Sequence, residues 1–432
     1  MSLAWDVRST SGTETPPDKW QVCRVGDLVT LINGHPFPSD SFGPAGDVPL
    51  VRIRDLTEHS FETYVTGHVP PSALLQNGDV VIGMDGDFNL VVWDRGLAAL
   101  NQRLCLLRPR ADVDMRFIAY ALPSSLKIIN DLTFATTVKH LSSTDVLSER
   151  IMLPPLEEQR RIANFLDSET TRIGKVRTVA DRLQTVLQER RNVQRSLILR
   201  GAGVSGPRTS HPMLGDLPAL WRTSPLKRLV PRIGVGVVVD PSSYFAEDGV
   251  PFLRGSNITE AGIDLTSVRF MSEANSKLLW RSRLNAGDVV VIRAGYPGRA
   301  AVVPKSLDGS NCASLLVIKQ GTHLLPEYLE AYFNSPLGNA YVDSVRYGAA
   351  QEQINVSHVV DFVIPVPPLD EQAAIIAKLQ SSERKANALT ERLARQKVLL
   401  DERRQALITA TVTGQFDVST ASGRNVTEGV AV

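Results

Sequence analysis

The residues that could carry out chemistry in this sequence do not assemble into a nucleotide or cofactor motif. The segment Gly234-Val235-Gly236 comes nearest to a dinucleotide-binding loop, but it lacks the third glycine and the acidic residue after a following strand. We therefore interpret it as a strand turn. The chain has no Gly-x-x-x-x-Gly-Lys-(Ser/Thr) loop to hold nucleotide phosphates, so ATP-driven movement would need another protein chain. The tetrapeptide typical of amino-methyltransferase active sites is also absent.

Metal, thiol and acid chemistry are not indicated either. The seven histidines have no spacing typical of metal ligands, and Cys23, Cys105 and Cys312 are isolated from one another. The carboxylate pairs at residues 157–158 and 370–371 stand at predicted helix starts, where they stabilise the helix dipole. We therefore predict no catalytic residue, no cofactor and no metal site.

The composition indicates an ordinary soluble protein, with 43% hydrophobic residues and a net charge of +1. A net charge near zero argues against a protein that coats nucleic acid indiscriminately, although it allows a local basic face. No apolar run approaches the roughly 20 residues that span a bilayer. Residues 1–19 contain no apolar signal-peptide core. Together with the isolated cysteines, these features predict a cytoplasmic protein.

One stretch occurs twice and predicts two long helices. Residues 154–166 read Pro-Pro-Leu-Glu-Glu-Gln-Arg-Arg-Ile-Ala-Asn-Phe-Leu, and residues 367–379 read Pro-Pro-Leu-Asp-Glu-Gln-Ala-Ala-Ile-Ile-Ala-Lys-Leu. Proline suits the first turn of a helix, and the carboxylates that follow favour its positive end. We expect the helices to run to about residues 200 and 413, which makes each roughly 65 to 70 Å long.

Apolar residues recur behind both starts at alternating steps of three and four, as in a helix that packs along its length against another helix. Because the two patterns stay in phase, we predict that the helices pair with each other as an antiparallel coiled coil. The predicted helix-pair seam consists of Ile162, Leu166, Ile173, Val176, Ala180, Leu183 and Leu187, together with Ile375, Leu379, Ala386, Leu389, Leu393, Leu400 and Leu407. Basic residues on both helices fit solvated faces, docking of partner proteins, or contact with nucleic acid.

The region before each helix is repeated as well. Short β-type runs between Gly and Pro turns, followed by a helical segment, predict a mixed α/β domain in each half. The number and order of the matches indicate an internal duplication. The matched pairs are Trp20 with Trp221, residues 48–52 with 250–254, residues 78–82 with 287–291, Asn101 with Asn311, Phe117 with Tyr328, and residues 139–142 with 352–355.

The loops of the two halves differ although the strands match. Residues 55–67 bear little likeness to residues 257–267, and the stretch before Lys139 differs from residues 345–351. One frame with two sets of loops is expected of two recognition modules that bind different targets. An alternative of another class is a coiled-coil scaffold whose repeated domains bind protein partners.

These features resemble the specificity subunit of type I restriction-modification enzymes, over nearly the whole chain. The resemblance rests on the Pro-Pro-Leu-(Glu/Asp)-Glu-Gln starts, the Gly-Asp turns, the tandem order and the Gln-x-x-Ile-Asn element at residues 351–355. The first half has residues 137–142 in place of that element. The family implies two target-recognition domains that each read half of a split DNA sequence, and a chain that is not itself catalytic. Its implied partners are double-stranded DNA, two modification (methyltransferase) subunits docked on the helices, and restriction (motor-nuclease) subunits that join through the complex.

The resemblance implies DNA contacts, and residue type suggests which side chains make them. Arginine pairs with guanine and Asn or Gln with adenine, while further basic residues bind phosphates. The candidates are Arg52, Arg54, Lys139 and His140 in the first domain and Arg254, Asn257, Arg293, Arg299, Arg346, Tyr347 and Gln351 in the second.

The expected order along the chain is thus domain, helix, linker, domain, helix. The predicted segments are a flexible N-terminus at 1–18, the first recognition domain at 19–153, the first long helix at 154–200, a linker at 201–218, the second recognition domain at 219–366, the second long helix at 367–413 and a C-terminal tail at 414–432.

Overall fold

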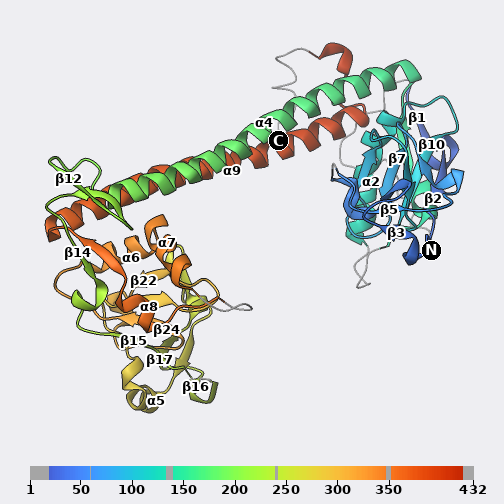
Figure 1. Cartoon of the computed structure of the whole chain (residues 1–432). Helices are drawn as coiled ribbons and strands as arrows, with labels where there is room; N and C mark the ends of the chain where they lie inside the picture. The colour runs from blue at the N-terminus through green and yellow to red at the C-terminus, as the bar shows by residue number, and fades with distance from the viewer. Residues whose placement is uncertain (1–18, 59, 133–139, 239–241, 347–351, 422–432) are drawn as a thin grey trace. The chain divides into compact units, whose positions relative to one another are not determined.

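The chain divides into two compact units in the computed structural model. Unit 1 comprises Met1–Ala180 and Arg395–Val432, and unit 2 comprises Asp181–Ala394. The residues that the structure describes are 19–58, 60–132, 140–238, 242–346 and 352–421. The predicted flexible N-terminus at 1–18 lies outside them. Each unit contains one sheet domain and part of both long helices (Figure 1).

Unit 1 is built mainly from short antiparallel strands. Its strands are β1 (Gln21–Arg24), β2 (Val29–Asn33), β3 (Phe42–Gly43), β4 (Val48–Val51), β5 (Tyr64–Val65), β6 (Leu74–Leu75), β7 (Val80–Gly83), β8 (Leu90–Val92), β9 (Ala98–Leu100), β10 (Leu104–Pro109) and β11 (Arg150–Leu153). Its shorter helices are α1 (Val25–Leu28), α2 (Met115–Leu132) and α3 (Ser143–Ser148). The sheet orders are β1-β11, β2-β10-β7-β8 and β3-β5-β4-β9-β6, the last of which includes the parallel pair β4–β9.

Unit 2 contains more strands and short helices than unit 1 in the described ranges. Its strands are β12 (Arg208–His211), β13 (Gly215–Pro218), β14 (Arg222–Pro225), β15 (Ile233–Val235), β16 (Phe245–Ala246), β17 (Val250–Leu253), β18 (Ile258–Thr259), β19 (Gly262–Ile263), β20 (Arg269–Met271), β21 (Val289–Ile292), β22 (Ala300–Val302), β23 (Asn311–Cys312), β24 (Leu315–Ile318) and β25 (Val363–Val366). Its shorter helices are α5 (Glu273–Leu278), α6 (Pro326–Phe333), α7 (Pro336–Val345) and α8 (Val356–Val360).

The two sheet domains repeat one topology, which confirms the duplication predicted from the sequence. The ribbon β1–β11 corresponds to β14–β25, and the order β2-β10-β7-β8 corresponds to β15-β24-β21-β22. The parallel pair β4–β9 corresponds to β17–β23. The predicted fold class, two tandem mixed α/β domains each followed by a long helix, is therefore confirmed.

Backbone hydrogen bonds correct one of the predicted matches. The amide of Asn101 donates to Val51 O over 3.2 Å, and the amide of Ala313 donates to Leu253 O over 2.9 Å. Asn101 therefore corresponds to Ala313, and the predicted match with Asn311 is wrong by two residues. The number that relates the two halves changes here because the segment from Leu100 to Leu104 is one residue longer than the segment from Cys312 to Leu315.

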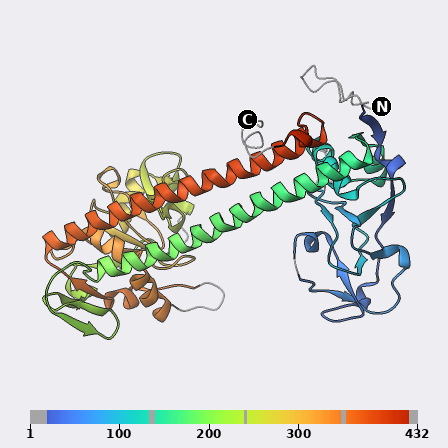
Figure 2. The same cartoon turned by 90° about the horizontal axis from the view of Figure 1, so that it is seen from above.

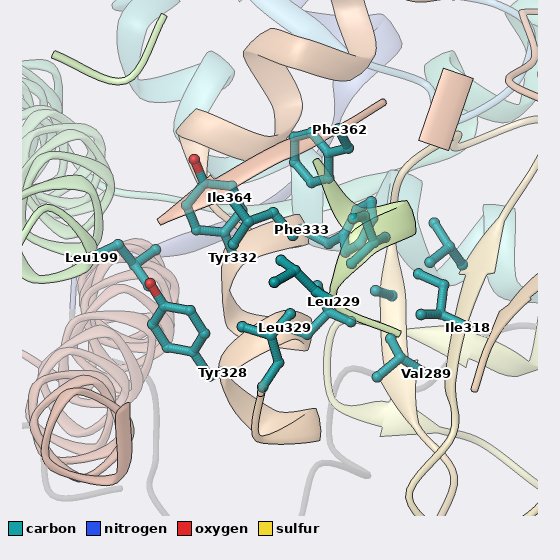
Figure 3. Close-up of a cluster of buried hydrophobic side chains, with 14 of the residues drawn as sticks. Leu199, Leu229, Val289, Ile318, Tyr328, Leu329, Tyr332, Phe333, Phe362 and Ile364 are labelled. Atoms are coloured by element: carbon teal, nitrogen blue, oxygen red, sulfur yellow. The ribbon is translucent and has the colours of Figure 1, made fainter. Parts of the chain in front are cut away.

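Each central strand is buried on both faces, so that alternate residues enter different cores. In β21, Val289 and Val291 belong to a cluster that includes Tyr328 of α6, while Val290 and Ile292 face another cluster. Figure 3 shows the first cluster, in which the aromatic residues lie between the sheet and the long helices. The strand β7 of unit 1 divides its residues in the same way.

The repeated Gly-Asp turn is held by its aspartate. Asp79 is 5% exposed; it accepts a hydrogen bond from the amide of Gln76 over 2.8 Å and two from the Arg108 guanidinium, both over 2.8 Å. In unit 2, Asp288 accepts one from the amide of Asn285 over 2.7 Å and pairs with the Lys319 ammonium over 2.6 Å. A buried carboxylate needs such partners because burial would otherwise destabilise its charge.

The stretch 201–218, predicted to be a linker, is a folded hairpin. It forms β12 and β13, and its side chains Leu214 and Leu217 are buried in the core of unit 2. The glycines that suggested a linker occupy turn conformations. Gly215, for example, has a φ of +72°, which favours glycine. Composition alone did not separate a turn-rich hairpin from a loose connection.

The two long helices are α4 (Leu156–Leu199) and α9 (Leu369–Val412), each of 44 residues. In unit 1, Arg177 pairs with Asp401, and Phe165 stacks on Phe416 with ring centroids 5.7 Å apart. In unit 2, Arg195 Nε lies 3.2 Å from Glu383 Oε1. Figure 2 shows the helices side by side. From the first ion pair to the second, the residue number rises from 177 to 195 in α4 and falls from 401 to 383 in α9. The two helices therefore run antiparallel, which confirms the prediction.

The predicted seam is buried only in part. Val176, Leu183 and Leu389 are 50%, 42% and 40% exposed, so their assignment to the seam is wrong. A pair of helices buries only a narrow stripe, and these residues lie outside it. Of the other residues predicted for the seam, Ile162, Leu166, Ile173, Ala180, Ile375, Leu379, Leu393 and Leu407 are buried, while Leu187, Ala386 and Leu400 are half-buried.

An acidic side chain is confined where α6 meets the helix pair in unit 2. Burial is the main reason that the pKa of Glu330 rises to about 7, and Glu327 and Glu383 raise it further. A hydrogen bond with the Val302 backbone and the charge of Arg195 oppose the rise. Because the folded-state pKa exceeds the unfolded value, this group's contribution to stability is present below about pH 4.5 and is lost as pH rises through about 7.

Replacing Glu330 with Gln should therefore stabilise the protein only where the wild-type carboxyl would be charged. We expect the melting temperature of Glu330→Gln to exceed that of the wild type at pH 8, with the difference shrinking towards pH 5. Thermal unfolding monitored across this pH range tests the expectation. Glu391→Gln, at an exposed position of α9 that does not act on the Glu330 carboxyl, serves as the control, and a pH-independent difference for Glu330→Gln would contradict the raised pKa.

Candidate nucleic-acid interface

In both units, one sheet turn is joined to the segment that precedes a short helix. The amide of Leu141 donates to Met84 O over 2.7 Å, and the amide of Ile354 donates to Arg293 O over 2.9 Å. Bridges between Asp85 and His140 and between Ala294 and Gln353 extend these contacts. The predicted correspondence of residues 140–142 with 353–355 is therefore confirmed, while Lys139 lies outside the described residues. We name these two junctions the tips of the recognition domains.

The tip of unit 1 carries an acidic residue between two basic ones. His140 Nδ1 lies 2.7 Å from Asp85 Oδ1, and Arg103 pairs with the other oxygen of Asp85 over 3.1 Å. Both basic side chains are more than half exposed, as their accessibilities of 67% and 68% indicate. Sequence reasoning identified His140 but missed Asp85 and Arg103, because only the bridge across the turn brings them together.

The tip of unit 2 carries arginines and an exposed aromatic ring. Arg293 Nε donates to Asn355 Oδ1 over 3.1 Å, so this half-buried guanidinium braces the junction. Arg299 lies over the ring of Tyr296 at 5.2 Å and pairs with Glu260 over 3.3 Å. Tyr296 is 71% exposed. Its position between Gly295 and Gly298, both with positive φ, was the signal that sequence reasoning overlooked.

Two candidate arginines instead begin the short 3₁₀ helices that follow β4 and β17. Arg52 donates through its amide and Nε to Asp55 over 2.9 and 3.0 Å, and the Arg254 amide donates to Asn257 Oδ1 over 2.9 Å. Asn257 is fully buried, and its Nδ2 donates to Asp264 O over 3.0 Å. Its selection as a DNA-contacting residue is therefore corrected, since both ends of its amide already serve the fold.

The remaining candidates are exposed or fall outside the description. Arg54 is 64% exposed and lies 3.8 Å from Asp55 and 3.9 Å from Glu62. Arg346 lies 2.6 Å from Glu352 and 3.4 Å from Asp343. Tyr347 and Gln351 lie outside the described residues. Exposed arginines in weak pairs can exchange their partners for phosphate or guanine at low cost.

The glycine segment nearest to a cofactor loop, and the metal-ligating and thiol side chains, have structural explanations. The segment 234–236 ends strand β15, and a Cβ at Gly236 would lie 2.4 Å from Cys312 O, so this glycine permits a close strand contact. Within those ranges, no cluster of three His, Cys, Asp or Glu side chains could hold a metal ion. Burial raises the pKa of the Cys105 thiol to about 12, which makes it a poor nucleophile.

No helix in the described part of the chain combines the length and apolar character needed to cross a membrane.

The long helices expose apolar side chains outside their shared seam. On the segments in unit 1 these are Val176 and Val179 of α4 with Val398 and Leu399 of α9; on the segments in unit 2 they are Leu183, Val186, Val193 and Leu197 of α4 with Leu369 and Leu389 of α9. Two pairs are related by the repeat, since Val176 corresponds to Leu389 and Val186 to Leu399. In unit 2, Val193 and Leu197 also line a cavity of about 530 Å³ with Met213, Leu337 and Tyr341. Exposed apolar residues that form a contiguous patch are typical of surfaces that bind other proteins.

Comparisons with known proteins agree with this architecture. The family model of the type I restriction modification DNA specificity domain matches residues 17–177. The chain is 27% identical to the type I restriction enzyme EcoBI specificity subunit of Escherichia coli over 375 residues, which are 84% of this chain and 79% of that protein. It is 22% identical to the type I restriction enzyme MjaVIII specificity subunit of Methanocaldococcus jannaschii, over 93% of this chain and 94% of that protein.

Solved structures share the fold. A chain from a type I restriction-modification system, solved to explain complex assembly and conformational transition, superposes with a TM-score of 0.73 at 20% identity and covers 93% of this chain and 100% of its own length. The HsdS subunit from Thermoanaerobacter tengcongensis gives a TM-score of 0.54 at 19% identity, with 94% and 99% covered. In its duplicated domains, its paired helices and its sequence, the chain is similar to type I restriction enzyme specificity subunits.

Proposed function

We propose that this chain is the non-catalytic, DNA-reading subunit of its complex and that each recognition domain reads one half of a bipartite target. The proposed recognition domains are residues 19–153 and 219–366, and the proposed long helical regions are residues 154–200 and 367–413. The observation that carries the proposal is one fold present twice with different polar side chains at equivalent tips. A duplicated scaffold with diverged tips suits two half-sites of different sequence.

The chemistry of the tips supports different half-sites. Asp85 beside His140 and Arg103 offers a carboxylate acceptor next to donors, whereas Arg299 and Tyr296 offer a guanidinium and an aromatic ring. Carboxylates accept hydrogen bonds from cytosine N4, and arginine donates to guanine O6 and N7. The two domains therefore present unlike hydrogen-bond patterns to DNA.

Removing arginines from one domain should relax one half-site at a time. We expect Arg299→Ala with Arg346→Ala to loosen base preference in the second half-site about tenfold or more, because a bidentate base contact contributes about 1–3 kcal/mol. Sequencing of modified bases in DNA methylated by the assembled complex measures the preference at each position. Arg54→Ala is the matched variant in the first domain and should leave the second half-site strict. Unchanged preferences in both variants would count against these residues.

The exposed apolar positions on the helices support docking of methyltransferase subunits. Apolar side chains at helical spacing on one face are suited to a partner helix. The repeat relates Val176 to Leu389 and Val186 to Leu399. Val176 and Leu399 therefore belong to a surface in unit 1, and Leu389 and Val186 belong to a similar surface in unit 2. We infer two modification subunits, one on each surface, with restriction subunits joining through them.

A charge placed on either surface should remove one modification subunit. Val186 and Leu399 are 47% and 51% exposed, so Val186→Asp and Leu399→Asp should leave the chain folded while weakening docking about 10-fold or more. Native mass spectrometry should then find one modification subunit in each single variant and none in the double variant. Gln188→Asp, at an exposed polar position of α4, is the control. Retention of both subunits in the double variant would exclude these surfaces.

The helix pair supports a fixed distance between half-sites. A rigid strut would allow any sequence in the spacer but only one spacer length. Removing one turn from both helices would shorten a strut by about 5 Å. Removing seven residues is a cleaner change, because the seam step from Ile173 to Ala180 to Leu187 is also seven residues and its phase is kept.

Deleting residues 177–183 and 390–396 together should shorten the spacer. The deletion removes roughly 10 Å of helix, which corresponds to about three base pairs at 3.4 Å each. Sequencing of modified bases should return the same half-sites with a shorter gap. Deletion in one helix alone should abolish assembly because it shifts one side of the seam against the other. An unchanged spacer length in the paired deletion would contradict the proposal that helix length fixes the distance between half-sites.

A further inference from the structure

The repeated Pro-Pro-Leu-(Glu/Asp)-Glu-Gln motif contains one glutamine whose side chain is almost completely buried in both halves. Gln159 and Gln372 are 1% and 0% exposed. Gln159 Nε2 donates to Pro154 O over 2.8 Å, and Gln372 Nε2 donates to Pro367 O over 2.9 Å. Each glutamine thus holds the proline turn from which its long helix begins.

The same glutamine also binds the recognition domain. The amide of Asp114, just before α2, donates to Gln159 Oε1 over 2.9 Å. The amide of Leu325, just before α6, donates to Gln372 Oε1 over 2.8 Å, and Gln372 Nε2 also donates to His323 O over 2.9 Å. Amides at a helix start lack partners within their own helix, so the glutamine supplies one. One side chain therefore joins the first turns of two helices that belong to different parts of the unit.

The residue before each glutamine makes a second contact with the domain. Trp20 Nε1 donates to Glu158 Oε1 over 3.2 Å, and Trp221 Nε1 donates to Glu371 Oε2 over 2.8 Å. The tryptophans precede β1 and β14, the first strands of the repeated domains. The Glu-Gln pair thus contacts the beginning of the domain and the start of its α2 or α6 helix.

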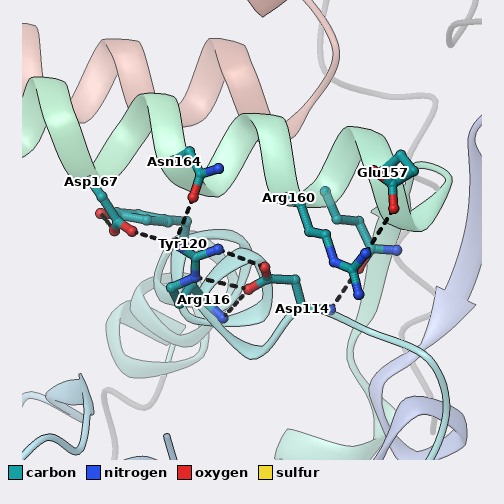
Figure 4. A network of polar contacts seen from close by, with 8 residues as sticks. Asp114, Arg116, Tyr120, Glu157, Arg160, Asn164 and Asp167 are labelled. Carbon is teal, nitrogen blue, oxygen red and sulfur yellow. Dashed lines mark hydrogen bonds and ion pairs between the residues drawn. The ribbon is translucent and has the colours of Figure 1, made fainter.

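Unit 1 has an additional set of polar contacts, shown in Figure 4. Arg116 of α2 donates through Nη1 to Asn164 Oδ1 over 2.8 Å and to Asp167 Oδ2 over 2.9 Å. Tyr120 OH donates to Asp167 Oδ1 over 2.8 Å. The positions of the second half that match Arg116, Tyr120, Asn164 and Asp167 hold Glu327, Ala331, Ala377 and Gln380, which cannot repeat this network.

We propose that Gln159 and Gln372 are positioning residues that hold each recognition domain at one angle on its long helix and thereby restrict the complex to one spacer length. This inference rests on the proposed function. A rotation of a domain about its junction moves its reading tip, and such a movement changes which spacer fits. The glutamine acts against that rotation because it is buried and its amide joins both elements. Gln372 carries more of this task, since unit 2 lacks the Arg116 network.

The test uses the complete complex with its methyltransferase subunits and the native target, identified first by sequencing of modified bases. Binding is measured to DNA with the native spacer and with spacers one base pair shorter and longer. In Gln372→Met, a residue of similar size without the amide, the preference for the native spacer should fall about tenfold. In Gln159→Met the fall should be smaller, and adding Arg116→Ala should make it equal to that of Gln372→Met. Gln188→Met, on the exposed face of α4, should keep the wild-type preference.

A purely structural role would give a different result. If affinity falls equally for all three spacers, or if the preference persists while hydrogen exchange shows that the Leu325 amide has lost protection, the proposal is overturned. Should Gln372→Met fail to fold, Gln372→Glu keeps the acceptor for Leu325 and removes the donors, and it should lose part of the preference. If the wild-type complex binds DNA without any sequence or spacer preference, the proposed function fails instead.

Discussion

The structure depends on the burial that the two long helices give each other and receive from the sheet domains at their ends. The first turns of α4, with Ile162 and Leu166, share a core in unit 1 with Leu407 and Val412 from the end of α9. In unit 2, the end of α4 shares a core with Ile375 and Leu379 from the start of α9. A 44-residue helix with one narrow apolar stripe would gain little from folding alone. Each helix is therefore stabilised by both units.

This arrangement explains why apolar residues remain exposed between the cores. Two helices cover only one stripe of each other, and the charged contacts Arg177 with Asp401 and Arg195 with Glu383 occupy part of that stripe. Val176, Leu183 and Leu389 remain 50%, 42% and 40% exposed. Exposed apolar side chains of this kind are buried when helices of another protein pack on them. The proposed docking of methyltransferase subunits gives these side chains a reason to be apolar.

Duplication preserved the contacts that build the frame and changed those at the tips. The Gly-Asp turn, the indole contact to the helix start and the buried glutamine each occur in both units. The tips have one backbone bridge but unlike side chains, with Asp85 and His140 in one and Arg293 and Tyr296 in the other. Backbone hydrogen bonds hold the shared geometry, so side chains can diverge without loss of the fold.

Local periodicity and repetition were sufficient to predict the helix starts, the antiparallel pair and the tandem domains, because each of these depends on residue spacing along one chain. Packing across the chain decided the rest. It buried Asn257, folded residues 201–218 into a hairpin, moved the partner of Asn101 to Ala313 and selected which stripe of α4 lies in the seam. Residue types and spacing do not reveal these outcomes, since the burial of a side chain depends on the neighbours that distant segments bring to it.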